Sequence, residues 1–464
     1  MRLSAAALDH LPANVARFGY NRSVQAVGIV HLGIGAFHRA HQAWYTDRAM
    51  DGAGAQAGRD FAIAGVSMRS TAVANQLNPQ DGLYTIAERS AAETRLRIIG
   101  AVRDVVVART ERARALALLA APSTCIVSLT VTEKGYARRA DGSLDVAVAA
   151  GEDSIYPLLT AGLLQRRQAA TAGVTLLSCD NLANNGEQLH KLLLAYLEPR
   201  NADLATWVAR ECTFPATMVD RIVPATTADD LSAVESQLGC RDEGAVLTEP
   251  FSQWVIEDRF AGRRPAWEAA GAQLVGDVAP YETAKLRMLN GAHSALAYLG
   301  LARGHTYVHQ AIGDAALRPL IERLMRQEAA TSFAPAPGQD LAAYADALLV
   351  RFANPALQHR LAQIAMDGSQ KIPNRWLPVL AAHRDRGQRC PAILAALGAW
   401  LRYVQGDSGQ IDDPQAQALR AAGIGTDLAG MAHAVFAPGG GLVGGWQPDD
   451  ADRELMGHGP FRDA

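Results

Sequence analysis

The chain has few cysteines, and none of them is spaced as a pair. Five cysteines occur in 464 residues, an odd number, and no two form a Cys-x-x-Cys motif. This spacing argues against a disulfide framework and against a structural zinc site. Reduced thiols are typical of cytoplasmic proteins, and the cytoplasm is the location we expect.

The chain also lacks long apolar runs and a surplus of charge of either sign. No run reaches membrane-spanning length, and residues 1–10 lack the sustained apolar core of a signal peptide. With 44 basic and 47 acidic residues, the net charge of −3 is spread along the chain and leaves no basic stripe. We therefore expect neither a nucleic-acid partner nor a membrane partner.

What the chain has is length, with an ordinary globular composition. Its 464 residues exceed the size at which one hydrophobic core usually stops growing, so two domains are expected. Apolar runs typical of strands alternate with helical stretches in the first part, whereas apolar residues recur only at helical spacing from Pro280 onward. The sequence predicts an α/β protein, with a Rossmann-type, doubly wound parallel sheet in residues 1–279 and an all-helical domain in residues 280–464. The predicted strands are residues 27–31, 61–67, 96–99, 125–130 and 174–178.

A Gly-x-Gly turn follows the first predicted strand. Gly33 permits a tight turn there, and Gly35 would let a pyrophosphate approach the main chain. The third glycine of the usual fingerprint is replaced by His38, so a plain strand-to-helix turn is the alternative. After the second strand no acidic residue is available for a ribose. Arg69 could meet a 2′-phosphate there, which leaves NAD and NADP both open.

Polar residues also follow two later strands. Residues 128–136 overlap and follow one strand, and residues 179–186, which include Asp180 and Asn181, follow another. Ligands bind beyond the carboxyl ends of strands in such sheets. We therefore expect a site there, although turn chemistry alone is the alternative.

Residues 281–300 form the predicted helix around which the catalytic hypothesis is built. At about 100° per residue, Lys285, Asn290 and His293 lie at roughly 0°, 140° and 80°, and Gly300 is the predicted stop. The face predicted to be buried consists of Tyr281, Ala284, Met288, Ala292, Ala295 and Leu299.

These polar residues suit the oxidation of an alcohol by a nicotinamide cofactor. Lys285 is the predicted general base, and Asn181 and Asn290 offer amide donors for an oxyanion. His293 could form a hydrogen bond with a substrate hydroxyl. Lys371 lies in a predicted turn at residues 366–373 and could bind a distal hydroxyl or carboxylate. A solvated lysine is the alternative for Lys371.

A metal site is a weaker alternative, because no dense cluster of ligands is present. His38 and His41 have a suitable spacing, and Glu133, Asp180 and His293 could join them.

Several blocks together resemble the polyol-specific long-chain dehydrogenase/reductase family, also called the mannitol dehydrogenase family. The resemblance implies zinc-independent NAD(P) chemistry, a Rossmann-type domain before a helical one, and a monomer. It also implies that Lys285 is the base, Asn181 and Asn290 the oxyanion donors, and His293 and Lys371 substrate-binding. The matching blocks are residues 33–41, 130–136, 178–181 with 185–186, 213–215 with 218–221, and 285–293. The expected cofactor contacts are Gly33, Gly35, Phe37, Arg69, Thr132, Glu133 and Asp180.

One departure bears on the substrate. Mannitol 2-dehydrogenases tend to carry an Arg eight residues before the substrate-binding Lys, and here Gln363 stands there. Residues 359–373, 254–258 and 78–84 look more like the fructuronate reductases. D-Mannonate/D-fructuronate is therefore the expected substrate pair, with Lys371 and Arg360 available for its carboxylate. A mannitol 2-dehydrogenase or arabinitol dehydrogenase is the alternative, and a non-catalytic dinucleotide-sensing protein is the alternative from another class.

Overall fold

The protein divides into two compact units, Met1–Val278 and Ala279–Ala464. The structure is a computed structural model and describes residues 1–52, 60–406, 411–437 and 446–457. Most of the glycine-rich stretch 436–446 lies outside the described residues.

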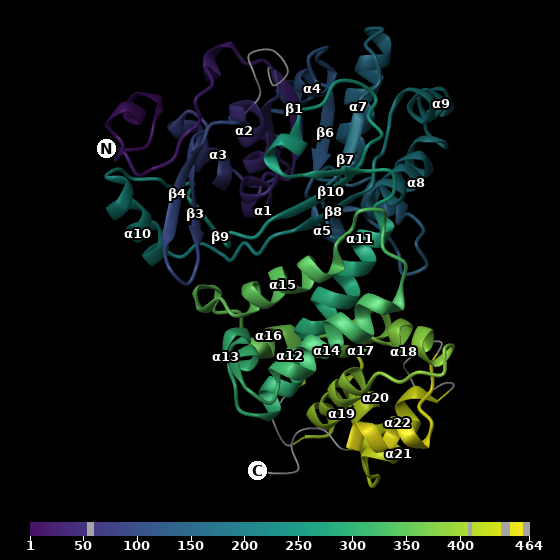
Figure 1. Ribbon diagram of the computed structural model, residues 1–464. Coiled ribbons are helices and arrows are strands. Elements are labelled where there is room, and N and C mark those ends of the chain that lie inside the picture. The colour runs from purple at the N-terminus through teal and green to yellow at the C-terminus, as the bar shows by residue number, and fades with distance from the viewer. Residues whose placement is uncertain (53–59, 407–410, 438–445, 458–464) are drawn as a thin grey trace. The chain divides into compact units, whose positions relative to one another are not determined.

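A five-stranded parallel sheet forms the centre of the N-terminal unit, and Figure 1 shows β1, β6 and β7 side by side in it. The strand order is β5-β2-β1-β6-β7, and every neighbouring pair is parallel. The order reverses between β1 and β6, which is the point where doubly wound sheets bind ligands. The strands are β1 (Val27–Leu32), β2 (Ala62–Ser67), β5 (Val102–Val107), β6 (Ile126–Leu129) and β7 (Thr175–Ser178).

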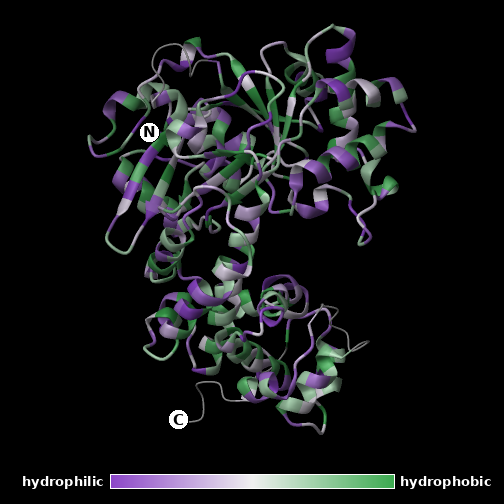
Figure 2. Ribbon diagram, turned by 45° about the vertical axis from the view of Figure 1, so that its right-hand side comes forward, coloured by the Kyte–Doolittle hydropathy of each residue, from purple (hydrophilic) through white to green (hydrophobic). Residues whose placement is uncertain are grey.

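The strands of this sheet are apolar on both faces because helices cover both sides. Val30 and Leu32 of β1 belong to one buried cluster, and Ile29 belongs to the other. In Figure 2 the strands are mostly green, while the helices carry purple residues on their outer sides. The helices of this unit are α1 (Ala36–Ala40), α2 (Gln42–Gly52), α3 (Ala72–Leu77), α4 (Arg112–Ala120), α5 (Thr132–Gly135), α6 (Val146–Ala149), α7 (Ile155–Gln168), α8 (Asn185–Leu197), α9 (Ala202–Glu211) and α10 (Ala228–Leu238).

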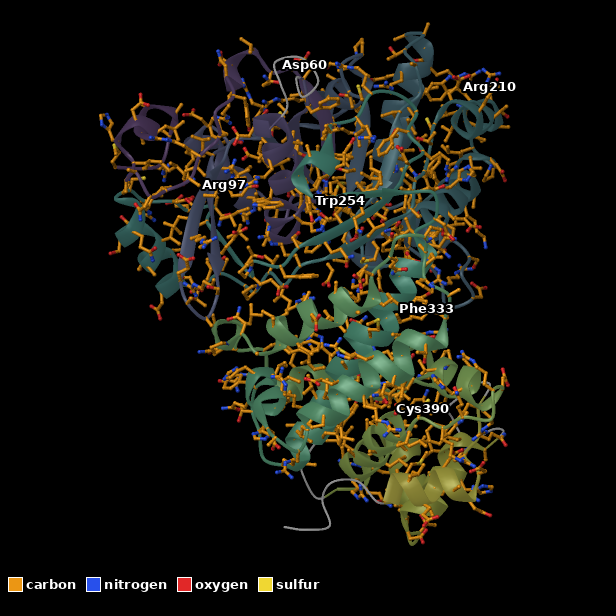
Figure 3. The ribbon with its side chains drawn as sticks, in the orientation of Figure 1. Asp60, Arg97, Arg210, Trp254, Phe333 and Cys390 are labelled. Atoms are coloured by element: carbon orange, nitrogen blue, oxygen red, sulfur yellow. The ribbon has the colours of Figure 1, made fainter. Side chains whose placement is uncertain are left out.

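Two three-stranded sheets complete the N-terminal unit. The first has the order β4-β3-β9 and the second β11-β10-β8. Trp254 of β10 is fully buried, whereas Arg210 of α9 is exposed (Figure 3). The strands are β3 (Tyr84–Arg89), β4 (Thr94–Ile99), β8 (Thr217–Asp220), β9 (Val246–Thr248), β10 (Gln253–Glu257) and β11 (Gln273–Val275).

One strand was predicted for the wrong sheet. Residues 96–99 lie in β4, which pairs antiparallel with β3 and not with the parallel sheet. The edge of the parallel sheet is formed by β5 instead. Residues 95–98 of β4 alternate between exposed or partly exposed and buried positions, which is typical of an antiparallel strand with one face on the core.

The described residues of the C-terminal unit form helices and no strand. Cys390, labelled in Figure 3, precedes α19, whose buried side chains pack against α12. The helices are α11 (Ala279–Ala284), α12 (Gly291–Ala302), α13 (Val308–Gly313), α14 (Arg318–Arg323), α15 (Leu341–Phe352), α16 (Leu361–Ala365), α17 (Gly368–Arg375), α18 (Leu377–Arg384), α19 (Pro391–Gln405), α20 (Ala416–Gly423), α21 (Leu428–Phe436) and α22 (Asp450–Gly457), with π-helices at Lys285–Asn290 and Leu324–Ala329.

The five cysteines are all free thiols. Within the described part of the chain, no helix has both the length and the apolar character needed to cross a bilayer.

Candidate active site

The turn after β1 needs glycine at one position and leaves open space at the other. Gly33 has a φ of +93°, and a Cβ atom there would lie 2.2 Å from the carbonyl oxygen of Thr130. At Gly35 the nearest atom to an added Cβ is the carbonyl oxygen of Gly33, 3.8 Å away. Gly33 is therefore required by the fold, whereas the space over Gly35 fits the close approach of a phosphate.

A buried chain of hydrogen bonds supports this turn from below. Thr130 Oγ1 donates to the carbonyl oxygen of Gly33 over 2.8 Å. His31 Nε2 lies 2.7 Å from Thr130 Oγ1, and His31 Nδ1 lies 2.8 Å from Ser128 Oγ. Since the hydroxyl proton of Thr130 goes to Gly33, a neutral His31 ring with its proton on Nε2 donates to Thr130 Oγ1. Burial lowers the pKa of His31 to about 3, so the ring is neutral.

His38 occupies the place of the missing third glycine, and its side chain lies in the core. Its ring is buried and stacks on His31 with 3.4 Å between centroids. Neither ring nitrogen has a hydrogen-bond partner among the described residues, and burial holds the His38 pKa well below its ordinary value. His38 therefore packs as a neutral ring. Its neighbour Phe37 is half-buried and stacks on His41.

Asp180, beyond the end of β7, holds the loop that follows β6. Its carboxylate accepts hydrogen bonds from the backbone amides of Val131 at 3.0 Å and Thr132 at 2.9 Å, and from the Tyr136 hydroxyl at 2.8 Å. Thr132 has a φ of +63°, an outlier for a β-branched residue. The Asp180 pKa is raised by burial, and these three donors oppose that rise. Asp180 is thus engaged within the protein, and its contact with the cofactor stays a prediction.

The other predicted residues of the N-terminal unit lie at the same edge of the sheet. Arg69 is exposed just after β2, Thr132 and Glu133 are exposed after β6, and Asn181 is exposed beyond β7. Because the strands are parallel, their carboxyl ends meet at one edge, and the sequence placed these residues there.

The long predicted helix exists but changes register in its middle. α11, the π-helix Lys285–Asn290 and α12 follow one another without a break. All six residues predicted to be buried are buried. The helix ends beyond Gly300, which is wrong as a predicted stop. A Cβ there would meet side chains of Leu361 and Ala311 at 2.7 and 2.9 Å, so this glycine permits close helix packing.

The π-helix corrects the angles predicted for the catalytic residues. It bonds residue i to residue i+5, so residues five apart stand one above the other, as residues four apart do in an α-helix. Gly291 N–H, for example, donates to the carbonyl oxygen of Leu286. Lys285 and Asn290 are five apart and both half-buried, so they share one side of the helix instead of diverging by roughly 140°.

His293 follows Asn290 by one turn of α12 and is partly buried. Its ring packs against Phe352, with 4.7 Å between centroids, and edge-on against His359 at 5.3 Å. Burial, with smaller effects from His359 and nearby arginines, holds the His293 pKa well below its ordinary value. A neutral imidazole offers one donor and one acceptor, which suits a hydroxyl group.

Lys371 lies in a helix and not in the predicted turn. α17 includes Lys371 and Pro373. The interruption between helices comes earlier, at Asp367, which has a φ of +56°. Tertiary contacts hold this helix in spite of its Gly and Pro: Ser369 N and Oγ donate to Asp413 over 2.8 and 2.6 Å. Lys371 Nζ donates to the carbonyl oxygens of Ile364 and Met366, and burial lowers its pKa.

Arg360 is exposed at the start of α16, with its guanidinium over the ring of Tyr307 at 5.5 Å. Its contact with a substrate carboxylate stays a prediction. A metal site has little support in geometry, because no group of three or more His, Cys, Asp or Glu residues suited to a metal occurs among the residues described.

Sequence reasoning missed the residues that hold the site rather than form it. They include His31 under the glycine turn, and Arg375 and Trp376 after Lys371. His31 lies in a strand and Trp376 between two helices, and no local pattern distinguishes them from ordinary core residues.

Comparison with known proteins covers both units. Residues 27–269 match the family model of the mannitol dehydrogenase Rossmann domain, and residues 277–442 match that of the mannitol dehydrogenase C-terminal domain. The D-mannonate oxidoreductase of Escherichia coli (strain K12) is 41% identical over 406 residues, which are 84% of this chain and 83% of that protein.

Two solved structures are similar over nearly the whole chain. The substrate-free D-sorbitol dehydrogenase has a TM-score of 0.87 at 31% identity and covers 93% of this chain and 92% of its own. The Pseudomonas fluorescens mannitol 2-dehydrogenase, in ternary complex with NAD and D-mannitol, has a TM-score of 0.79 at 34% identity, with 98% and 95% covered. Because both family models match, and together they cover most of the chain, this protein is an oxidoreductase that belongs to the mannitol dehydrogenase family.

Proposed function

We propose that this enzyme uses NAD, without a metal ion, to interconvert D-mannonate and D-fructuronate. The observation that carries the chemistry is the π-helix, because it places Lys285 and Asn290 on one side of the same helix. Oxidation of a secondary alcohol uses a base for the hydroxyl proton and a donor to the negative charge that develops on the oxygen.

Lys285 is the proposed general base. Its side chain is half-buried, and its amine would take the hydroxyl proton of the substrate. Asn290 donates to the oxygen as negative charge develops on it, and Asn181 is the proposed second donor. His293, neutral by burial, binds a neighbouring hydroxyl.

The N-terminal unit supplies the proposed cofactor site. NAD, when bound, accepts the hydride from the carbon that bears the hydroxyl group. The open space over Gly35 fits its pyrophosphate, and Phe37, Arg69, Thr132 and Glu133 lie around the same edge of the sheet. NAD is the proposed cofactor over NADP, because the similar mannitol 2-dehydrogenase structure contains NAD. NADP is the alternative cofactor, because Arg69 is exposed and could bind its 2′-phosphate.

The sugar-acid substrate is proposed on three grounds. One of the most similar relatives is a D-mannonate oxidoreductase. Gln363 replaces the arginine that mannitol 2-dehydrogenases tend to carry. Lys371 keeps one of its three N–H donors beyond its two carbonyl partners, so the ammonium could meet a carboxylate. Mannitol 2-dehydrogenase activity is the second candidate, because a mannitol 2-dehydrogenase is 34% identical over nearly the whole chain.

A matched rate comparison tests the substrate. Reduction of D-fructuronate and of D-fructose is measured with NADH and with NADPH, at equal enzyme concentration. We expect D-fructuronate with NADH to give the highest kcat/KM. A preference for D-fructose would make the enzyme a mannitol dehydrogenase, and no turnover of either would refute both assignments.

Replacement of the base tests the chemistry. We expect Lys285→Ala to abolish turnover while NADH binding, followed by fluorescence titration, stays nearly unchanged, because the base acts only on the substrate. Lys191→Ala, at an exposed position of α8, is the control and should keep full activity. Substantial activity of Lys285→Ala would remove Lys285 from this role.

We also propose a monomer in the cytoplasm. The free state of all five cysteines supports a reducing compartment. Light scattering of the purified protein tests the monomer.

A further inference from the structure

We propose that Arg375 and Trp376 are positioning residues that hold the Lys285–Asn290 segment in its π register. We call these two residues the brace. Their support of the helix is independent of the proposed function, whereas their effect on catalysis rests on the proposed roles of Lys285 and Asn290.

The π register needs support because it is the less stable one. π-helices are rare and usually form a single wide turn within an α-helix. If this segment relaxed to the α register, Asn290 would rotate away from Lys285 toward the separation that an α-helical wheel gives. The polar face on which the chemistry depends therefore exists only while the wide turn is maintained.

Two consecutive side chains bond two consecutive carbonyl groups at the point where the π-helix becomes α12. Arg375 Nη1 donates to the carbonyl oxygen of Asn290 over 3.1 Å and to Ser294 Oγ over 2.7 Å. Trp376 Nε1 donates to the carbonyl oxygen of Gly291 over 3.1 Å. These bonds fix the last carbonyl of the π-helix and the first of α12.

Another π-helix in the described part of the chain also has side-chain partners at its C-terminal end. It spans Leu324–Ala329, and its last two carbonyl oxygens also bond side chains. His383 Nε2 lies 2.8 Å from the carbonyl oxygen of Glu328, and Ser332 Oγ donates to that of Ala329 over 2.6 Å. Side-chain partners at the end of the wide turn are thus common to both π-helices.

The charge and burial of the two residues favour this role. Trp376 is completely buried, so its N–H would be costly to leave without a partner. Arg375 has no carboxylate partner within the described ranges, and burial lowers its pKa to about 10. A guanidinium in this setting is stabilised by the carbonyl and hydroxyl groups that it bonds. Its positive charge also lowers the pKa values of Lys371 and His293.

The helix that carries Arg375, α17, is itself anchored by contacts of its first turn. Its first turn is bonded to Asp413 through Ser369. Its first residue, Gly368, lies so close to Tyr298 and Trp400 that a Cβ atom would be 2.5 Å from each. Lys371 lies one helical turn before Arg375, so α17 connects the proposed substrate-binding lysine to the helix that carries the base.

The test compares Trp376→Phe and Arg375→Met with Trp267→Phe. Trp376→Phe keeps an aromatic ring at the site but removes the N–H donor together with the five-membered ring that carries it. Trp267 is an equally buried tryptophan in the N-terminal unit, and its Nε1 donates to Thr46 Oγ1 over 3.0 Å, so Trp267→Phe removes a comparable bond elsewhere. Amide hydrogen exchange of residues 285–295 is measured for each variant, together with kcat and with KM for NADH.

We expect exchange in residues 285–295 to accelerate about tenfold in Trp376→Phe and Arg375→Met, because one or two buried hydrogen bonds are lost. Their kcat should fall by roughly ten- to a hundredfold, with KM for NADH nearly unchanged, because the base and donor are misplaced. Trp267→Phe should change neither the amide exchange of residues 285–295 nor kcat.

Unchanged exchange in both brace variants would overturn the proposal, as would equal acceleration in Trp267→Phe. Faster exchange with full kcat would overturn the catalytic part alone. If the wild type turns over no sugar acid or polyol, the proposed function fails, and the exchange measurement still decides the brace.

Discussion

Asp180 is a single buried side chain that determines the backbone conformation of a neighbouring loop. Its carboxylate receives two backbone amides and one phenol hydroxyl, and one of those amides belongs to Thr132 in the left-handed region. A left-handed conformation costs a β-branched residue about 1–2 kcal/mol. The hydrogen bonds of Asp180 offset that cost at the edge of the sheet where the cofactor is proposed to bind.

We predict that Asp180→Asn raises KM for NADH. The substitution would place an amide NH2 donor where a carboxylate oxygen now accepts a backbone N–H. Adding Thr132→Gly should recover part of the loss, since glycine adopts positive φ without the steric cost. Ala137→Gly is the control: Ala137 also has a positive φ, of 48°, but its amide bonds Lys134 and not Asp180. Equal recovery with Ala137→Gly would mean that general loop flexibility explains the effect.

In the strand-turn-helix element formed by β1 and α1, one glycine is required by the fold, and the other leaves room for the proposed ligand. A methyl group at Gly33 would collide with the backbone of Thr130, whereas one at Gly35 would meet no atom closer than 3.8 Å. The two glycines therefore have different reasons to be glycine.

We predict that Gly33→Ala lowers the free energy of unfolding by several kcal/mol, or prevents folding. Gly35→Ala should keep the melting temperature within a few degrees of wild type, yet weaken NADH binding at least tenfold, because its methyl group fills the space proposed for the phosphate. Thermal unfolding and NADH titration of both variants check this. Normal NADH affinity in a folded Gly35→Ala protein would count against a pyrophosphate at this turn.

At the scale of the whole molecule, buried neutral histidines make stability depend on pH. Burial lowers the pKa values of His31, His38 and His293. Below the unfolded value of about 6.5, the unfolded chain binds protons that the folded chain does not. Their contribution to stability is therefore complete above pH 6.5 and is lost as the pH falls toward the folded pKa.

His38→Phe isolates one such group, because His38 has no hydrogen-bond partner among the described residues. The free energy of unfolding of wild type should fall more steeply with acidification than that of the variant. The difference should change by about 1.4 kcal/mol per pH unit below pH 6.5. Urea unfolding at pH 7, 6 and 5 measures it, with His10→Gln at an exposed position as the control. Parallel curves for wild type and His38→Phe would contradict the buried neutral state.

The features that could be predicted from the amino-acid sequence alone are those that depend on short-range physics. Apolar runs located β1, β2, β6 and β7, because buried parallel strands are apolar on both faces. Helical spacing identified the buried face of residues 281–299, and the Gly-x-Gly pattern indicated the turn at Gly33. The order of the motifs indicated the mannitol dehydrogenase family, which the comparisons confirm.

Features that depend on residues distant in the sequence could be seen only in the folded protein. A wheel drawn at 100° per residue could not show the π register, in which Arg375 and Trp376 bond the helix from more than 80 positions away in the sequence. Likewise, a hydrogen bond to Asp413 stabilises α17, although this helix contains Gly and Pro. Antiparallel pairing with β3 places residues 94–99 outside the parallel sheet. Local preferences differ by about 1 kcal/mol or less, so a few long-range hydrogen bonds and packed side chains are enough to override them.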